Sequence, residues 1–195
     1  DGQWLGNERD GLGVHIWPDG AQYKGEWRRN MATGKGYFKH ADGDCFAGEW
    51  HNNTAHGKGI YQHRDRTTYE GYFVDDLQDG FGMETWPDKS QFMGTFKQGK
   101  KNGVGVYRWP DGSTYAGQWD QNQIHGVGTY IGADGRHFEG RWQTSMMHGV
   151  GRYIWPDGRS YHGQYYLDHK DGFGIFMWAD GRRYEGSWSG GRQHG

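Results

Sequence analysis

Aromatic rings and glycines recur along this chain with a period of 23 residues. Each repeat carries one ring two residues before a glycine and a second ring two residues after it, as in the segment Tyr23-Lys-Gly25-Glu-Trp27. Alternation of such positions with polar ones has the period of two that is typical of a β-strand. We therefore predict a strand in which Tyr23, Gly25 and Trp27 share one face.

The same pattern continues to the C-terminus without an insertion or a deletion. Later repeats contain the equivalent core positions Tyr115, Gly117, Trp119, Tyr184, Gly186 and Trp188. A Gly-X-Gly segment follows each ring-bearing strand, as at Gly34 and Gly36, and Gly195 is the first glycine of the last one. We predict that residues 1–195 form one continuous array of nine registers, whose first and last are incomplete because the array is cut from a longer chain.

The Gly-X-Gly segment predicts a second strand, and a turn such as Pro18-Asp19-Gly20 separates the two strands. Proline fixes φ and glycine accepts a positive φ, so each repeat is expected to be a β-hairpin. Because glycine inside a strand marks close approach of another group, we expect rings to lie over the glycines of neighbouring strands. The predicted fold class is all-β, an elongated and twisted single array of stacked antiparallel β-hairpins.

Composition agrees with an array that has no thick core. Only 33% of the residues are hydrophobic, whereas the hydrophobic fraction of an ordinary globular domain is about half. Aromatic residues make up 17%, which excludes a disordered chain, since such chains are poor in rings. The formal net charge of -2 argues against nucleic-acid binding, which usually needs a basic excess.

One repeat shows the family resemblance in full. The unit Tyr115-Ala-Gly117-Gln-Trp119, then His125-Gly126-Val-Gly128-Thr-Tyr130, then Asp134-Gly135, resembles the MORN (membrane occupation and recognition nexus) motif. The resemblance extends over the whole chain, in register. It is strongest to the repeat-only cytoskeletal MORN scaffolds of protists, and it implies a scaffold without catalytic activity.

The resemblance implies that the protein is a scaffold. Such a scaffold self-associates and organises protein partners in a cytoskeletal or membrane-associated assembly, such as a division ring. The resemblance also implies a homodimer, which we place at the C-terminal repeats, near Trp188. Two alternatives stay open: an adaptor that binds acidic phospholipid headgroups, and a targeting module of a larger protein. No serine or cysteine lies in the sequence context of a catalytic nucleophile, so we expect no enzyme activity and no required cofactor.

A structural zinc site is the sharpest local hypothesis. His40 and His63 occupy a column that elsewhere holds tryptophan, and Cys45 lies across the turn from His40. Asp42 and its next-repeat equivalent Asp65 would supply a carboxylate. Thiolate, imidazole and carboxylate are the ligands that zinc accepts. The alternative is that imidazoles replace indoles and Cys45 is a reduced bystander; the turn geometry decides whether His40 and Cys45 face the same side.

Basic residues concentrate near the C-terminus. Residues 136–195 contain eight basic and six acidic side chains, and Arg159, Arg182 and Arg183 are the candidate lipid-binding cations. Membrane attachment through charge usually needs a dense cluster, so only weak binding of acidic phospholipid is expected. The single cysteine and the absence of a signal peptide or long apolar run predict a cytoplasmic location, at the cytoskeleton or the inner face of a membrane.

Overall fold

The computed structural model describes residues 1–194 and shows antiparallel strands joined by turns, with no helix in that range. The predicted all-β class and the stacked hairpins are confirmed. By its contacts the chain divides into two compact units, residues 1–100 and residues from 101 onward. The prediction of one continuous domain stays a prediction, and Gly195 lies outside the described residues.

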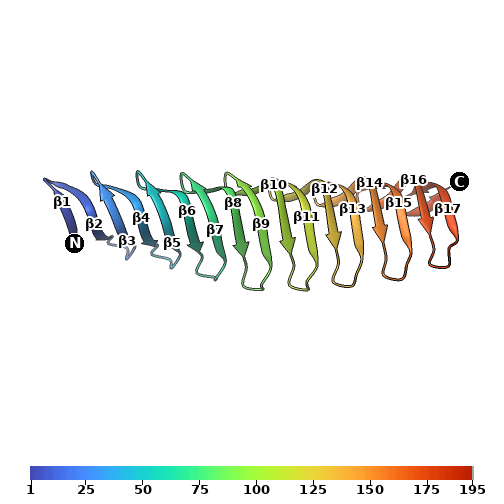
Figure 1. The fold of residues 1–195 in the computed structure, drawn as a ribbon, viewed down its shortest axis with the longest axis horizontal. Helices are drawn as coiled ribbons and strands as arrows, with labels where there is room; N and C mark the ends of the chain where they lie inside the picture. Colours follow the sequence, from blue (N-terminus) through green and yellow to red (C-terminus); the bar gives the residue numbers. More distant parts are fainter. Residues whose placement is uncertain (195) are drawn as a thin grey trace. The chain divides into compact units, whose positions relative to one another are not determined.

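In the N-terminal unit each strand pairs with its neighbours in sequence, so the sheet order follows the chain (Figure 1). Its strands are β1 (Gly2–Leu5), β2 (Glu8–Ile16), β3 (Gln22–Arg28), β4 (Met31–Lys39), β5 (Cys45–His51), β6 (Thr54–Gln62), β7 (Thr68–Val74), β8 (Leu77–Thr85) and β9 (Gln91–Lys97).

The C-terminal unit follows the same order. Its strands are β10 (Lys100–Arg108), β11 (Thr114–Asp120), β12 (Gln123–Ile131), β13 (His137–Gln143), β14 (Met146–Ile154), β15 (Ser160–Tyr166), β16 (His169–Met177), β17 (Arg183–Ser189) and β18 (Arg192–His194).

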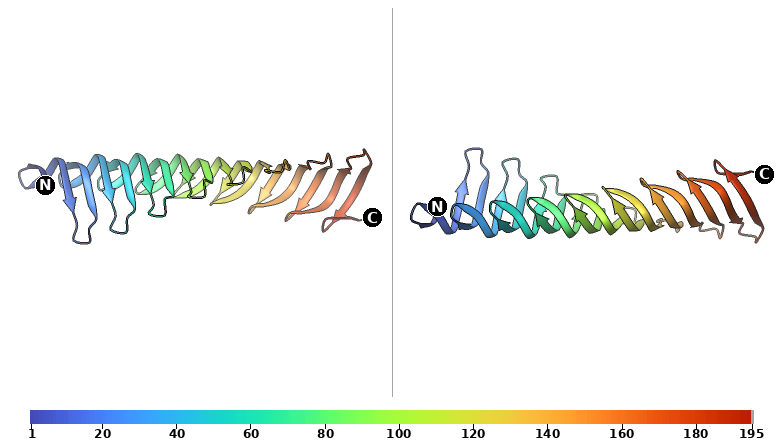
Figure 2. Two further views of the ribbon diagram at one scale, coloured as in Figure 1. Left: turned by 90° about the horizontal axis from the view of Figure 1, so that it is seen from below. Right: turned by 90° about the horizontal axis from the view of Figure 1, so that it is seen from above.

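Long turns occur where the sequence predicts them. Between β2 and β3 the N–H of Trp17 donates to the carbonyl of Ala21 (2.9 Å), and Gly20 has a φ of 91°. Glycine is suited to this position because it has no Cβ to clash at positive φ. In the N-terminal unit, the loops that join β2 to β3 and β4 to β5 stand out from the sheet (Figure 2).

Short turns alternate with the long ones, and the sequence pattern did not predict their geometry. Arg29 and Asn30, between β3 and β4, have φ values of 47° and 67°, the two positive values of a type I′ hairpin turn. The N–H of Asn30 donates to the carbonyl of Arg9 (3.0 Å), and the Asn30 Oδ1 accepts from the N–H of Arg9 (2.9 Å). Each short turn therefore also fixes one repeat to the preceding one.

The core consists of rings laid over glycines, as predicted. Gly25 pairs with Gly36 across β3 and β4, and a Cβ added to Gly36 would lie 2.6 Å from Cζ of Tyr23. The Tyr23 hydroxyl donates to the carbonyl of Glu26 (3.0 Å). Among the predicted core rings, Tyr184 is half-buried and the following are buried: Tyr23, Trp27, Tyr115, Trp119 and Trp188.

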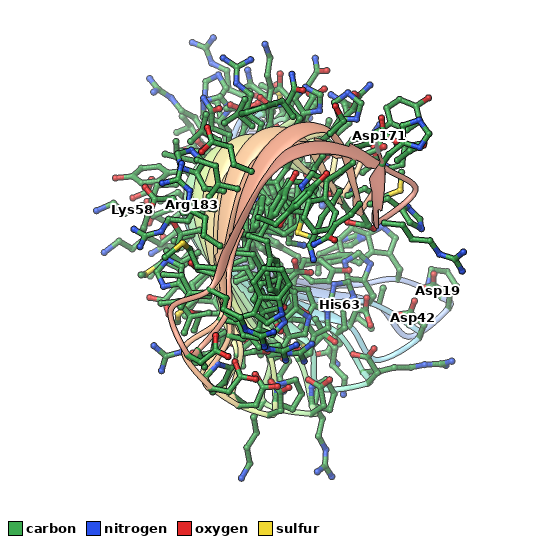
Figure 3. The ribbon with its side chains drawn as sticks, turned by 90° about the vertical axis from the view of Figure 1, so that its right-hand side faces the viewer. Asp19, Asp42, Lys58, His63, Asp171 and Arg183 are labelled. Carbon is green, nitrogen blue, oxygen red and sulfur yellow. The ribbon has the colours of Figure 1, made fainter. Side chains whose placement is uncertain are left out.

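Each sheet therefore has two different faces. The ring face carries the glycines and the aromatic side chains, and the outer face carries the residues between them. Figure 3 shows His63 on the ring side of the curved ribbon and Lys58 on the outer side. Because the ring face is curved and the outer face is exposed, the two faces offer different surfaces for binding.

Candidate functional site

The ring face of the N-terminal unit contains a groove of about 730 Å³. One side of it is formed by ring-bearing strands and the other by the short turns at Asn30, Asn53 and Asp76. Its aromatic lining comprises Trp17, Tyr23, Trp27, Phe38, Phe46, Trp50, Tyr61 and Phe73. Four of these rings are buried, and four stay partly accessible, as is typical of surfaces that bind another molecule: Trp17, Phe38, Trp50 and Tyr61.

Two alanines create the groove. Ala32 pairs with Trp27 across β3 and β4, and Ala55 pairs with Trp50 across β5 and β6. Both alanines are buried beneath rings, with exposed fractions of 5% and 6%. Since a methyl group fills little of the space between the rings, this part of the ring face stays open.

The C-terminal unit has a smaller groove of about 480 Å³ on its ring face. Here Ile124 and Met147 occupy the floor positions that alanines hold in the N-terminal unit. Their larger side chains fill more of the space between the rings. The two grooves thus differ at the floor position of the repeat, two residues before the Gly-X-Gly segment.

Lys170 holds this floor position near the C-terminus. Its Nζ lies 4.7 Å from the ring centroid of Phe176 and 4.9 Å from that of Trp188. Burial, and secondarily the charge of Arg159, lowers the pKa of Lys170. The rings attract the ammonium group through their π faces, which partly offsets the loss of hydration.

The structure separates two of the predicted zinc ligands. The ring of His40 packs against Phe38, with ring centroids 4.5 Å apart, and lines the groove. The Cys45 Sγ instead accepts a hydrogen bond from the hydroxyl of Tyr37 (3.0 Å), which is exposed on the outer face. The side chains of His40 and Cys45 therefore lie on opposite faces of the sheet.

The other predicted ligands are used within the loops. The Asp42 Oδ1 accepts from the N–H of Asp44 (3.1 Å), and the Asp65 Oδ1 accepts from the N–H of Thr67 (2.8 Å). The hydrogen bond from the Thr67 N–H lowers the pKa of Asp65. Within residues 1–194 no three His, Cys, Asp or Glu side chains form a group that could hold a metal ion, so the geometry gives the zinc hypothesis no support.

His63 has a partner that the sequence reading overlooked. Its Nδ1 lies 3.2 Å from Asp44 Oδ2, which also accepts from the hydroxyl of Tyr61 (2.8 Å). The Asp44 Oδ1 accepts from the N–H of Arg64 (2.9 Å), and this hydrogen bond is the main cause that lowers the pKa of Asp44. Asp44 thus ties its own loop to the next one and performs a structural role.

Carboxylates neutralise the three candidate lipid-binding arginines. Arg159 and Arg182 each form an ion pair of 2.8 Å with the aspartate two residues before them, and Arg183 pairs with Glu185. All three arginines stay exposed, and surface ion pairs are weak, so lipid binding stays a prediction. No helix within residues 1–194 could cross a bilayer.

The sequence carried a signal for the groove that the search for rings and glycines missed. The floor column holds residues of very different size and charge, namely Arg9, Ala32, Ala55, Gln78, Lys101, Ile124, Met147 and Lys170. Variation at one position of an otherwise regular repeat indicates where repeats differ in function.

Comparison with family models identifies the repeat. The MORN repeat model matches residues 1–22, 23–45, 46–68, 69–91, 92–114, 115–135, 138–158, 161–182 and 184–195. These matches cover nearly the whole chain and follow its 23-residue period. No curated protein matches the chain significantly.

Comparison with solved structures finds distant likeness to other proteins. The TCP domain of SAS-4 from Drosophila melanogaster, in complex with a proline-rich motif of Ana2, is 9% identical with a TM-score of 0.48, over 91% of this chain and 90% of that one. A mutant TCP10 domain of CPAP from Danio rerio is 15% identical with a TM-score of 0.43, over 89% and 92%. Likeness at this level carries no functional argument.

Proposed function

Because this chain belongs to the MORN repeat family, we propose that it is a non-catalytic scaffold that binds protein partners on its ring face. The observation that carries the proposal is the groove of about 730 Å³ over Ala32 and Ala55. It combines accessible rings with short turns that present Asn53 and Asp76 at its edge. Aromatic pockets with a polar rim supply most of the affinity in protein interfaces.

The outer face of the C-terminal unit supports the second part of the proposal, self-association. Val127, Val150 and Phe173 occupy the position between the two glycines of successive repeats, with exposed fractions of 56%, 53% and 54%. A row of exposed apolar side chains marks an interaction surface. We propose that a homodimer forms through this row, and that the scaffold serves a cytoplasmic cytoskeletal or membrane-associated assembly such as a division ring.

Selection from a random peptide library tests the binding function. The wild-type chain serves as bait, and the Ala55→Trp variant, whose indole fills the groove, serves for counter-selection. We expect peptides that bind the wild type and the outer-face control Lys58→Ala but not Ala55→Trp. Recovery of no peptides, or of peptides that bind all three chains equally, would contradict the proposal.

Light scattering during size-exclusion chromatography tests self-association. We expect a mass of twice the 22.4 kDa of the single chain, and a monomer for the double variant Val127→Asp and Val150→Asp. A wild-type monomer would remove this part of the proposal. Sedimentation with acidic phospholipid vesicles tests the adaptor alternative, which predicts salt-sensitive binding that is lost on Arg182→Ser with Arg183→Ser.

A further inference from the structure

Four rings surround the ammonium group of Lys170 in the C-terminal unit. Besides the two nearest rings, Phe176 and Trp188, its Nζ lies 5.1 Å from the ring centroid of Trp155 and 5.3 Å from that of Tyr161. We call these four residues the Lys170 box. Each distance is within the range of about 6 Å over which a ring attracts a cation.

The N-terminal unit contains a second box with the same residue types in the same places. A shift of 138 residues, six repeats, converts Lys170 into Ala32. The same shift converts the four ring residues into Trp17, Tyr23, Phe38 and Trp50. All four pack around the buried Ala32, and we call them the Ala32 box.

Ring spacing is nearly the same in the two boxes. The centroids of Tyr23 and Trp50 are 5.1 Å apart, and those of Tyr161 and Trp188 are 5.3 Å apart. The spacing is 5.5 Å against 5.8 Å for the Trp17–Phe38 and Trp155–Phe176 pairs. It is 6.1 Å against 6.0 Å for the Phe38–Trp50 and Phe176–Trp188 pairs.

Hydrogen bonds hold two rings of the Ala32 box in place. The indole N–H of Trp50 donates to the carbonyl of Gly36 (3.2 Å), as that of Trp188 donates to Gly174 (3.3 Å). The Tyr23 hydroxyl is engaged by the backbone, as described above. These bonds use the polar edges of the rings and fix their positions, although the tilt between rings differs in the two boxes, 76° against 49° for the Trp17–Phe38 and Trp155–Phe176 pairs. A box arranged before its ligand arrives loses little entropy on binding.

Other repeats indicate which ligand fits this box. Arg9 occupies the floor position of the first repeat and lies 4.1 Å from the ring centroid of Trp27. Cations thus occupy this position over rings in both units, at Arg9 and at Lys170. The Ala32 box has no side chain of its own in that place. Asp76 lines the same groove one repeat further on, where it accepts from the N–H of Ala55 (2.7 Å), and it gives the groove a negative charge.

We propose that the Ala32 box binds the ammonium group of a lysine side chain that a protein partner inserts into the groove. This inference rests on the proposed function, since it names what the groove recognises. The partner's lysine takes the place that Lys170 takes in its own box. Its methylene chain passes between the rings of Trp17 and Trp50, and its ammonium group is attracted by their π faces.

A small probe tests the site directly. Nα-acetyl-lysine methylamide is titrated into the ¹⁵N-labelled wild-type chain, and the indole N–H signals of Trp17 and Trp50 are followed by NMR. The neutral control probe is the same compound with its side-chain nitrogen acetylated. We expect the charged probe to shift these signals and to bind roughly tenfold more tightly than the control. Equal binding of the two probes, or no shift at either indole, overturns the proposal.

A substitution inside the chain gives a second test. Ala32→Lys supplies the box with a lysine of its own, and Ala32→Met supplies similar bulk without charge. In Ala32→Lys we expect the ring currents to move the ε-methylene proton signal upfield, as for Lys170 in the same spectrum, and we expect probe binding to be lost. An ε-methylene signal at the position of an exposed lysine, in a folded variant, overturns the proposal.

The peptide selection described above separates failure of this inference from failure of the proposed function. Groove-dependent peptides that lose affinity when their lysines are acetylated agree with both. Groove-dependent peptides that tolerate acetylation overturn the lysine site and leave the scaffold function intact. If no groove-dependent peptide is recovered, the function itself fails, and binding of the charged probe still measures whether the box takes an ammonium group.

Discussion

The Ala32 box and the Lys170 box consist of the same four kinds of ring, yet one is open and the other is filled. Their ring centroids agree in spacing within a few tenths of an ångström. The difference lies in one floor residue, alanine or lysine. In this repeat the glycines and rings therefore maintain the sheet, whereas the floor position decides whether a repeat binds a ligand or fills its own site.

The outer faces of the two units differ in a similar way. Between the paired glycines the N-terminal unit alternates in character, with Leu12, Lys35, Lys58 and Phe81, whereas the C-terminal unit has only apolar residues there, including Val127, Val150 and Phe173. These positions point away from the rings, so they can vary without disturbing the core. One unit thus combines the larger groove with an outer face of mixed character, and the other combines a smaller groove and a filled box with an apolar outer face.

The largest loss of stability is expected when the glycine beneath the tyrosine of either box is replaced. In Gly36→Ala the new methyl group would lie 2.6 Å from Cζ of Tyr23, and in Gly174→Ala it would lie 2.5 Å from Cζ of Tyr161. Neither ring can move away, because its hydroxyl is bonded to the backbone. We expect each variant to lose about 3 kcal/mol of unfolding free energy, measured by denaturant titration.

Lys35→Ala, next to Gly36 on the outer face, is the control and should change the unfolding free energy little. If Gly36→Ala were as stable as this control, the overlying tyrosine ring would not require a glycine beneath it. A large loss in only one of the two glycine variants would show that the two boxes do not share the same packing.

A smaller effect is expected from emptying the filled box. Lys170→Ala removes the methylene chain and the ammonium group from four rings, and we expect a loss of about 1–2 kcal/mol in denaturant titration. Lys170→Met keeps most of the packing and should recover part of that loss. The emptied box should also bind Nα-acetyl-lysine methylamide, so a Lys170→Ala chain that binds no more probe than the wild type would contradict the equivalence of the two boxes.

The sequence predicted the framework of both boxes because the framework depends on periodic residues. The strands, the long turns and the packing of Tyr23 over Gly36 all follow from the 23-residue pattern. The floor position was missed because alanine and lysine are unremarkable when each is read alone. The outer-face position of Cys45 also follows from the pattern, because Cys45 directly precedes the ring-face residue Phe46 in β5 and successive strand residues point to opposite faces.

Alkaline pH measures how much the tyrosine hydroxyls contribute to the stability of both boxes. Burial raises the pKa of Tyr23 and of Tyr161 to about 12 from the ordinary value of 10.0. The folded chain then holds protons that the unfolded chain has lost, so stability is fully present below pH 10 and falls as pH rises toward 12. We expect circular dichroism to show unfolding in this interval.

Phenylalanine variants sharpen that result. Phe46 and Phe138 show that the ring fits without a hydroxyl at this position of the repeat. We therefore expect Tyr23→Phe to cost less than about 1 kcal/mol at neutral pH, where it loses one hydrogen bond. Above pH 10 its stability should fall less steeply than that of the wild type, and the same should hold for Tyr161→Phe. An unchanged alkaline slope in both would place the cause elsewhere.

The smallest effect concerns the long turns, where the two units again use one position differently. Asp44 accepts hydrogen bonds from Tyr61 of β6 and from Arg64 of the next loop, whereas its equivalent Arg182 pairs with Asp180 of its own loop. Asp44→Ser should therefore lower the unfolding free energy by about 1 kcal/mol. Because its carboxylate pKa is lowered in the folded chain, this contribution should disappear as pH falls through that pKa, and the variant and the wild type should converge in acid.

Arg182→Ser breaks no contact with another repeat and should not change the unfolding free energy measurably. If Arg182→Ser were the more damaging of the two, the long turns of the C-terminal unit would be the ones that connect its repeats.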